Sequence, residues 1–315
     1  MHTCLLKLQQ TRPLKVDGTT KKGLSMFDKI KSFCGKLKGF LLTPISVIFL
    51  LYLLVTVISS ISFPLLSKYV LPNTSIGIYN KDFWVNLLIN LNASLIDFVF
   101  FGIALFIFQR KNERRMLIEE TKNNLSDIST FNEIKLNVSK VGMIRRLNEQ
   151  KCFTISMQRM NISGKGVTMK DVKLIDSDLT GLEGESVYFN TVHFEGCNFR
   201  GSNFQKSVLR NLTMINCTLR NTNFSNSNLK GALLKECRLM GAKFNGTDLQ
   251  SAILSGSNLE RVDYNGANLN FCNLKGAMNI DVTELCKAAT LNYIVLEPAI
   301  EQQVKAIRSD VKFSR

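Results

Sequence analysis

Residues 201–277 of the chain read GSNFQKSVLRNLTMINCTLRNTNFSNSNLKGALLKECRLMGAKFNGTDLQSAILSGSNLERVDYNGANLNFCNLKGA. Leu, Phe, Met or Tyr occupies 21 of the 22 positions reached in steps of five from Met169 to Leu274, and Gly184 is the exception. Gly, Asn or Asp fills 15 of the 22 places two residues after these centres. The chain therefore repeats with a period of five residues.

A period of five excludes the two common regular structures. In an α-helix five residues turn the chain by about 500°, so successive centres lie ~140° apart and no single face is apolar. In a flat strand five is an odd number, so successive centres alternate between the two faces. All centres point inward only if the chain bends after each short segment, and Gly, Asn and Asp tolerate such bends. Repeated segments and corners form coils that stack into a solenoid.

The repeated units resemble a known family. Gly256-Ser-Asn-Leu259 and Gly266-Ala-Asn-Leu269 are similar to the repeats of the pentapeptide-repeat family. This resemblance implies that four pentapeptides make one coil of a right-handed quadrilateral β-helix, which we expect over residues 151–280. Gly184 is expected to mark an irregular corner, and a two-residue slip near Gly164 to separate a weaker first pair of repeats.

The two ends of a solenoid need covers, because an open coil exposes unpaired backbone groups. Residues 110–150 are expected to form a helical linker and cap, and their ending Ile144-Arg-Arg-Leu-Asn148 resembles the lead-in of membrane-anchored bacterial members of the family. Residues 281–315 are expected to form a C-terminal helical cap and tail, with the capping helix over Val282–Leu291.

Two long apolar segments precede the repeats, and Asp97 carries the only charge within them. About 20 apolar residues, at about 1.5 Å per residue, cross the hydrocarbon core of a bilayer. We therefore predict transmembrane helices over about 40–63 and 84–108, which form a hairpin in a domain of residues 40–109.

Basic residues predict the orientation of this hairpin. The segment 1–39 carries nine Lys or Arg and two acids, whereas the link between the apolar segments has Lys68 and Lys81 as its only basic residues. Four further basic residues follow the second apolar segment: Arg110, Lys111, Arg114 and Arg115. Because basic flanks stay in the cytoplasm, we expect a two-pass protein of the bacterial inner (cytoplasmic) membrane with both termini cytoplasmic.

A polar stripe runs along the second apolar segment. Asn86, Asn90 and Asp97 follow helical spacing, and Ser94 lies beside them. A charge near the middle of a span is costly and usually faces protein or water. The stripe is therefore a candidate seam for self-association or a water-lined path between protomers. The alternative is a protonated Asp97 that is hydrogen-bonded to a hydroxyl of the first span, on Thr56, Ser59 or Ser60.

The predicted solenoid carries six outward residues that form a candidate partner surface: Arg200, Arg210, Arg220, Lys230, Leu233 and Ile253. A spacing of twenty places Arg200 over Arg220 and Arg210 over Lys230, and such basic pairs attract acidic partners or anionic lipid. Leu233 and Ile253 form a small apolar patch. The alternative is an ordinary solvated face.

The sequence offers little for catalysis. It has two histidines, neither in a recognisable motif, and it has no phosphate-binding loop, nucleophile elbow or dinucleotide fingerprint. No two of the eight cysteines are spaced as C-x-x-C. Cys197, Cys217 and Cys237 are one predicted coil apart, so we expect them to stack as small packing residues, and Cys272 to lie inward as well. We expect no enzyme activity, no metal and no cofactor.

Three functional hypotheses remain. The first is a non-enzymatic scaffold whose partners are the lipid bilayer and an unidentified cytoplasmic protein. The second is a membrane effector that forms homo-oligomers through the Asp97 stripe and changes permeability, for example in defence or stress. The third, a topoisomerase-binding DNA mimic, comes from the family resemblance. The net charge of +15 argues against it and against nucleic acid mimicry generally.

Overall fold

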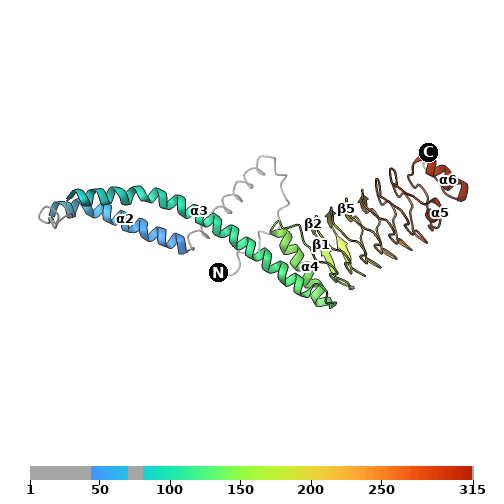
Figure 1. Ribbon diagram of the computed structural model, residues 1–315, viewed down its shortest axis with the longest axis horizontal. Helices are drawn as coiled ribbons and strands as arrows, with labels where there is room; N and C mark the ends of the chain where they lie inside the picture. The colour runs from blue at the N-terminus through green and yellow to red at the C-terminus, as the bar shows by residue number, and fades with distance from the viewer. Residues whose placement is uncertain (1–43, 70–80, 314–315) are drawn as a thin grey trace, which may run out of the picture. The chain divides into compact units, whose positions relative to one another are not determined.

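The structure is a computed structural model that describes residues 44–69 and 81–313, so the predicted basic segment 1–39 lies outside the described residues. The chain divides into two compact units, Met1–Glu113 and Arg114–Arg315, and each is described by itself. Figure 1 shows helices in the first unit and stacked coils in the second.

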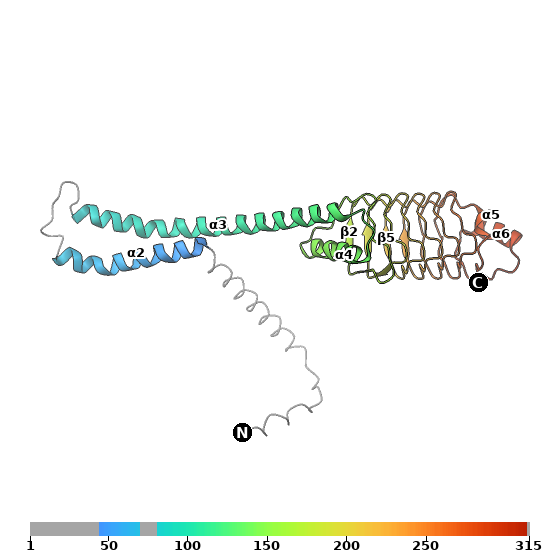
Figure 2. The same cartoon turned by 90° about the horizontal axis from the view of Figure 1, so that it is seen from below.

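Two helices make up the described part of the first unit: α2 (Pro44–Tyr69) and the beginning of α3 (Lys81–Ile128). They lie side by side in both views (Figures 1 and 2). The Tyr52 ring stacks on Phe98 with 5.3 Å between centroids, and its hydroxyl donates to the Leu91 carbonyl at 3.3 Å. Helix α3 continues twenty residues beyond the predicted end of the span at Phe108, because the charged residues that follow are good helix formers.

One helix among the described residues is long and apolar enough to cross a membrane, the Asp82–Ile128 part of α3. Only 6% of its most apolar window is buried inside the protein, unlike the core helix of a soluble domain. The described apolar part of α2, Leu50–Ser59, is shorter than a span. The predicted pair of spans is therefore supported at α3 by length and composition, and at α2 stays a prediction.

The second unit is a β-solenoid with four sides. Its regular strands form one parallel pair, β1 (Thr168–Lys170) with β3 (Tyr188–Asn190), and one parallel sheet in the order β2 (Lys173–Ile175), β4 (His193–Glu195), β5 (Thr213–Ile215) and β6 (Leu233–Lys235). Single-residue parallel bridges continue these ladders, for example from Asn198 to Thr218 to Arg238. Paired residues are twenty apart, which confirms four pentapeptides per coil.

The corners of the coils have the backbone conformation that the sequence predicts. Each of the 22 places two residues after a centre, from Asp171 to Gly276, has a positive φ. Asn, Asp and Gly adopt this left-handed region most readily, and larger side chains adopt it at a cost. The bend after each quintet is therefore confirmed at every corner, including those with large residues such as Lys206 and Phe271.

The interior of the solenoid is filled by stacked side chains. Phe204, Phe224, Phe244 and Tyr264 form a ladder with successive ring centroids 5.4, 5.2 and 6.2 Å apart. A second ladder consists of Cys197, Cys217 and Cys237, which are buried as predicted, and Cys272 is buried as well. Such packing leaves each inward residue in contact with the same position one coil away.

The regular register changes near Gly164, as predicted. The bridges Ser156–Asp178 and Asn161–Glu183 span 22 residues instead of twenty, so the first coil contains two additional residues. The prediction for Gly184 is wrong. This residue is buried at an inward position of a regular coil, where an added Cβ would lie 3.2 Å from the Phe204 ring. The ring of the next coil fills the space that a side chain at 184 would need.

Helix α4 (Ile134–Glu149) lies at one end of the coils (Figure 2). Its buried residues follow helical spacing: Asn137, Lys140, Val141, Ile144 and Leu147. The last three join the solenoid core. Leu125, near the end of α3, is buried in the same core. The expected N-terminal cap is therefore made of two helices with a break between Ile128 and Ile134.

The C-terminal cover differs from the prediction. The expected capping helix over Val282–Leu291 ends after one turn, as α5 (Val282–Leu285). The chain then returns to the solenoid, where Thr290 bridges Asn268 and Val295 bridges Asn273. Backbone pairing with the last coil satisfies its exposed groups and takes the place of a longer helix. Helix α6 (Pro298–Ile307) follows, with Val304 buried.

Candidate functional site

The predicted basic pairs stack as expected, but they lie on different corners. The Gly201 amide donates to the Arg220 carbonyl at 2.8 Å, and the Asn211 amide donates to the Lys230 carbonyl at 3.2 Å. Arg200 and Arg220 follow the Asn198 ladder, whereas Arg210 and Lys230 follow the Val208 ladder two sides further on. The two pairs therefore occupy opposite corners of the four-sided coil and cannot belong to one small contact area.

The predicted apolar patch lies beside the second pair. Leu233 and Ile253 bridge each other on the side that follows the Lys230 corner, and Ile253 is 39% exposed. The structure therefore brings together Arg210, Lys230, Leu233 and Ile253.

Two further residues on this corner were not predicted from the sequence. Phe271 is 51% exposed and stacks on Tyr293, which is 38% exposed, with 5.0 Å between centroids and 13° between ring planes. Their φ values are +59° and +60°. Phe271 stands in a place that Gly, Asn or Asp usually fills, and this departure is the signal that could have revealed it.

The transmembrane candidates separate into two sides of α3. Asn86, Asn90 and Asp97 are exposed, whereas Ser94 is half-buried and forms a hydrogen bond with the Tyr52 hydroxyl of α2. An α-helix turns 100° per residue, so Ser94 lies about 60° around the helix from Asp97, toward the α2 contact. Ser94 therefore belongs to the contact between α2 and α3 rather than to the stripe.

The hydroxyls expected to bind Asp97 have other partners. Thr56 donates to the Tyr52 carbonyl at 2.8 Å, and Ser59 donates to the Val55 carbonyl at 2.7 Å, both within α2. The side chain of Ser60 lies outside the described residues. Thr56 and Ser59 thus donate to carbonyls within α2, and Asp97 is exposed on the single chain.

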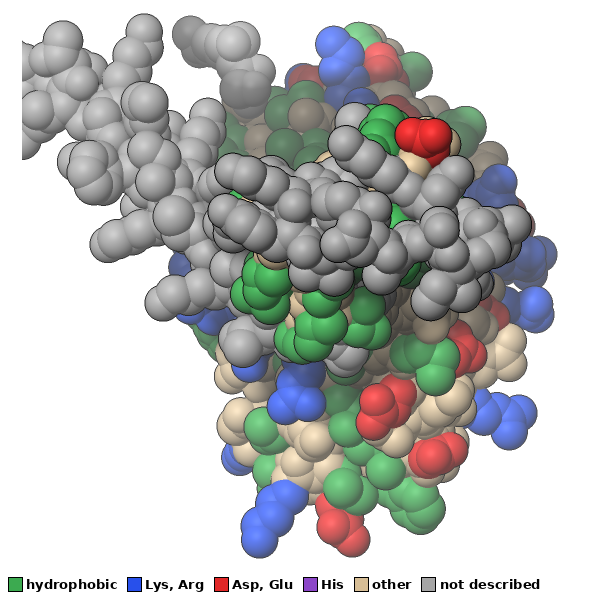
Figure 3. Space-filling model, turned by 90° about the vertical axis from the view of Figure 1, so that its left-hand side faces the viewer, with side chains coloured by type: hydrophobic (Ala, Val, Ile, Leu, Met, Phe, Trp, Pro, Cys, Tyr) green, Lys and Arg blue, Asp and Glu red, His purple; other side chains and the backbone are tan. Residues whose placement is uncertain are grey.

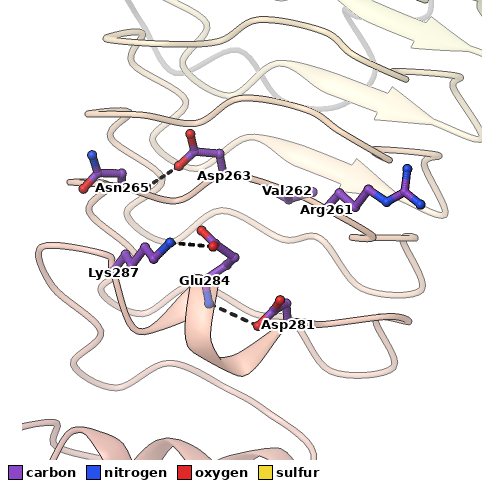
Figure 4. A pocket seen from close by; sticks show the side chains of 7 residues that line it. All are labelled: Arg261, Val262, Asp263, Asn265, Asp281, Glu284 and Lys287. Atoms are coloured by element: carbon purple, nitrogen blue, oxygen red, sulfur yellow. Dashed lines mark hydrogen bonds and ion pairs between the residues drawn. The ribbon is translucent and has the colours of Figure 1, made fainter.

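A surface cleft of about 600 Å³ lies beside α5 (Figure 4). Its charged groups already have partners. Asp281 accepts from the Thr283 hydroxyl and from the backbone amides of Glu284 and Thr283, and these hydrogen bonds hold the pKa of Asp281 below its usual value. Lys287 pairs with Glu284 at 2.5 Å, and Asp263 accepts from the Asn265 amide at 2.9 Å. These carboxylates support the local fold, and no group of three metal ligands occurs among the described residues.

Lys140 is the most deeply buried cation among the described residues. Its ammonium donates to the Phe131 and Asn161 carbonyls at 2.5 and 2.7 Å and to the Asn137 amide oxygen at 2.9 Å. Burial lowers its pKa to about 8. All three donors are used, so Lys140 ties α4 to the loops around it and leaves no proton for an external ligand.

In the face shown in Figure 3, acidic side chains lie among the Lys and Arg side chains, so charge does not mark that face as a binding site. The cysteine ladder offers no reactive thiol at Cys217: the Cys197 thiol lowers the pKa of this group, but the Cys237 thiol and burial outweigh that effect and raise the pKa to about 12. The surface features that remain are the corner with Phe271 and the stripe with Asp97.

Comparison with known proteins identifies the repeat. Residues 187–264 match a family model described as a pentapeptide repeat region. With the twenty-residue register, this match shows that residues 187–264 lie in a pentapeptide-repeat β-solenoid. No curated protein matches the chain.

Several solved structures are similar to parts of the chain. A trypsin-treated variant of QnrB1, a plasmid-mediated fluoroquinolone resistance protein, is 16% identical with a TM-score of 0.35, over 50% of this chain and 86% of that one. A pentapeptide repeat protein from the Arabidopsis thaliana thylakoid lumen is 26% identical with a TM-score of 0.25, and the match covers 29% of this chain and 75% of that one. HetL from Nostoc sp. strain PCC 7120, involved in heterocyst differentiation regulation, is 15% identical with a TM-score of 0.26, and the match covers 49% of this chain and 82% of that one.

Proposed function

We propose that the chain is a non-enzymatic scaffold that presents its solenoid to a protein partner in the cytoplasm. The observation that carries this proposal is the filled interior. Inward positions hold stacked Phe, Leu and Cys side chains, so the described coils offer outer sides and corners instead of an enclosed substrate site. Pentapeptide-repeat proteins are generally non-enzymatic and often act as binding scaffolds, which agrees with this proposal.

The same proposal includes a two-pass anchor in the bacterial inner membrane, with both termini cytoplasmic. Its support is the apolar part of α3, the packing of Tyr52 on Phe98, and the basic residues on both sides of the 40–109 domain. Reporter fusions test the topology. Alkaline phosphatase fused after residue 75 should be active, and fused after residue 315 should be inactive. The reverse pattern, or activity at neither site, contradicts the proposal.

The scaffold proposal is tested by affinity capture of the full chain from detergent-solubilised membranes. A matched chain that ends at residue 113 keeps the described helices of the first unit and lacks the solenoid. We expect a defined protein to be recovered with the full chain and lost with the shortened one. Recovery of the same proteins with both chains would contradict a role for the solenoid.

A second candidate function is a membrane effector that oligomerises and changes permeability. The observation that favours it is the outward position of Asn86, Asn90 and Asp97, on a different side of α3 from the α2 contact. Polar groups that face hydrocarbon are costly, and a second copy covers them. Overexpression of wild type should depolarise cells, and Asp97→Ala should abolish the effect. Equal depolarisation by both chains would remove this candidate.

The topoisomerase-binding hypothesis is the weakest of the three. The chain carries 40 basic and 25 acidic residues, and a mimic of DNA needs the opposite balance. Protection of gyrase by the full chain in a supercoiling assay would restore this hypothesis.

A further inference from the structure

The fold carries an aromatic pair where aromatic residues are unfavourable. Phe271 and Tyr293 stack on each other at successive turns of one corner, both with left-handed φ. A bulky residue in this conformation is strained, and Asn or Gly at the same place is less strained. About half of the Phe271 side chain remains in water. The pair contributes little to the core and presents two large rings to solvent.

The rest of this corner supplies cations and no acids. Backbone hydrogen bonds stack the corner coil by coil, from Asn211 to Lys230, from Gly231 to Gln250 and from Phe271 to Asn292. Between Asn190 and Tyr293, the corner positions contain Arg210 and Lys230 but neither Asp nor Glu. The adjoining side carries Leu233, Ile253 and Val295 at its outward bridge positions.

We propose that this surface docks an acidic, extended segment of a partner protein that carries apolar anchor residues. We name it the Phe271 corner and define it by Arg210, Lys230, Leu233, Ile253, Phe271 and Tyr293. The proposal rests on the proposed scaffold function and specifies where and with what chemistry the partner binds. Arginines and lysines recognise carboxylates, and exposed aromatic residues with aliphatic neighbours provide the apolar pocket.

The spacing of the corner sets the length of the segment. Neighbouring coils lie ~4.8 Å apart, so Arg210 and Phe271 are separated by about 14 Å along the stack. An extended chain advances ~3.3 Å per residue, which places an acidic residue about four positions from its apolar anchor. The four coil steps from Arg210 to Tyr293 accommodate about six residues of such a segment.

Charge argues for this occupant over two others. A second copy of the chain that docked through the same corner would bring Arg210 and Lys230 against the same two cations of its partner. An anionic bilayer would be attracted equally by the Arg200 and Arg220 corner, which has no comparable aromatic pair. An acidic apolar segment matches both the cations and the rings of the Phe271 corner.

The probe for the test is a random twelve-residue peptide display library, selected on the full chain in nanodiscs made of uncharged lipid. We expect enriched peptides that carry Asp or Glu about four positions from Phe, Leu, Ile or Trp. A fluorescent copy of an enriched peptide should bind at least tenfold more weakly to Phe271→Asn and to Lys230→Glu. Arg220→Glu, which makes the same charge change on the opposite corner, should leave its affinity unchanged.

The melting temperature of Phe271→Asn should lie within a few degrees of wild type, because Asn suits the left-handed corner. Failure to enrich acidic apolar peptides, or equal loss of binding in Lys230→Glu and Arg220→Glu, would overturn the inference. Self-association abolished by Phe271→Asn would assign the surface to a second copy instead. Binding to anionic vesicles that both charge reversals weaken equally would assign it to lipid. If affinity capture with Phe271→Asn still recovers the wild-type partner, the scaffold function stands and the Phe271 corner does not serve it.

Discussion

Replacing Tyr264 with phenylalanine should stabilise the solenoid, although it removes a polar group from a native core. Tyr264 ends the aromatic ladder and is almost completely buried, and its hydroxyl has no hydrogen-bond partner among the described residues. Burial raises the pKa of this phenol, as expected of a group withdrawn from water. A buried hydroxyl without a partner costs about 1–3 kcal/mol. The phenylalanine ring keeps the stacking on Phe244 and avoids that cost.

The free energy of unfolding should therefore rise by roughly 1–2 kcal/mol in Tyr264→Phe. Urea unfolding of residues 114–315, followed by circular dichroism, measures the change. With a slope of about 2 kcal/mol per molar, the midpoint should move up by about 0.5–1 M urea. The control is Tyr188→Phe, since Tyr188 is 44% exposed and its hydroxyl reaches water. A fall of the midpoint in Tyr264→Phe, with Tyr188→Phe unchanged, would show that the hydroxyl is bonded and that the reasoning is wrong.

Three further predictions concern the same unit. Phe224→Ala removes the middle of the aromatic ladder and should lower the free energy of unfolding by about 3–5 kcal/mol in urea titrations. Gly184→Leu restores the five-residue pattern, yet it should lower the free energy of unfolding by about 1–3 kcal/mol because the leucine side chain would clash with the Phe204 ring. Adding Phe204→Ala to the same chain should relieve part of that loss. The pKa of Lys140 is about 8 in the folded protein and about 10.4 in an unfolded chain. Between these two pH values the unfolded state binds more protons than the folded state. The free energy of unfolding should therefore rise with pH from about 8 to about 10.4. Thermal melts from pH 7.5 to 10.5 measure this rise, and Lys140→Met should flatten it.

The stacked coils could be predicted from the sequence because each five-residue segment repeats the same pattern of residue types. The centre residue is apolar and the corner residue tolerates a left-handed backbone, so 22 consistent steps outweigh any single exception. The cysteine ladder and the stacking of Arg210 on Lys230 follow from the same twenty-residue register.

The parts that were not predicted depend on neighbours from other coils. Gly184 interrupts the apolar pattern without interrupting the coil, because the Phe204 ring fills its place. The capping helix is short because residues 287–295 find partners in the last coil, which no local pattern records. The stacking of Phe271 on Tyr293 joins positions 22 residues apart, and the second of these lies beyond the regular repeat.

The register of twenty has a consequence for how such a protein can change in evolution. Duplication of the twenty residues of one coil would lengthen the solenoid by one coil and leave both terminal covers intact, because every coil pairs with its neighbours through the same backbone groups. Insertion or deletion of one, two or three whole quintets would rotate all later sides relative to earlier ones and disrupt any outer column that spans several coils, whereas the two additional residues of the first coil leave the register of the sides unchanged. Viable changes in the number of quintets should therefore be multiples of four.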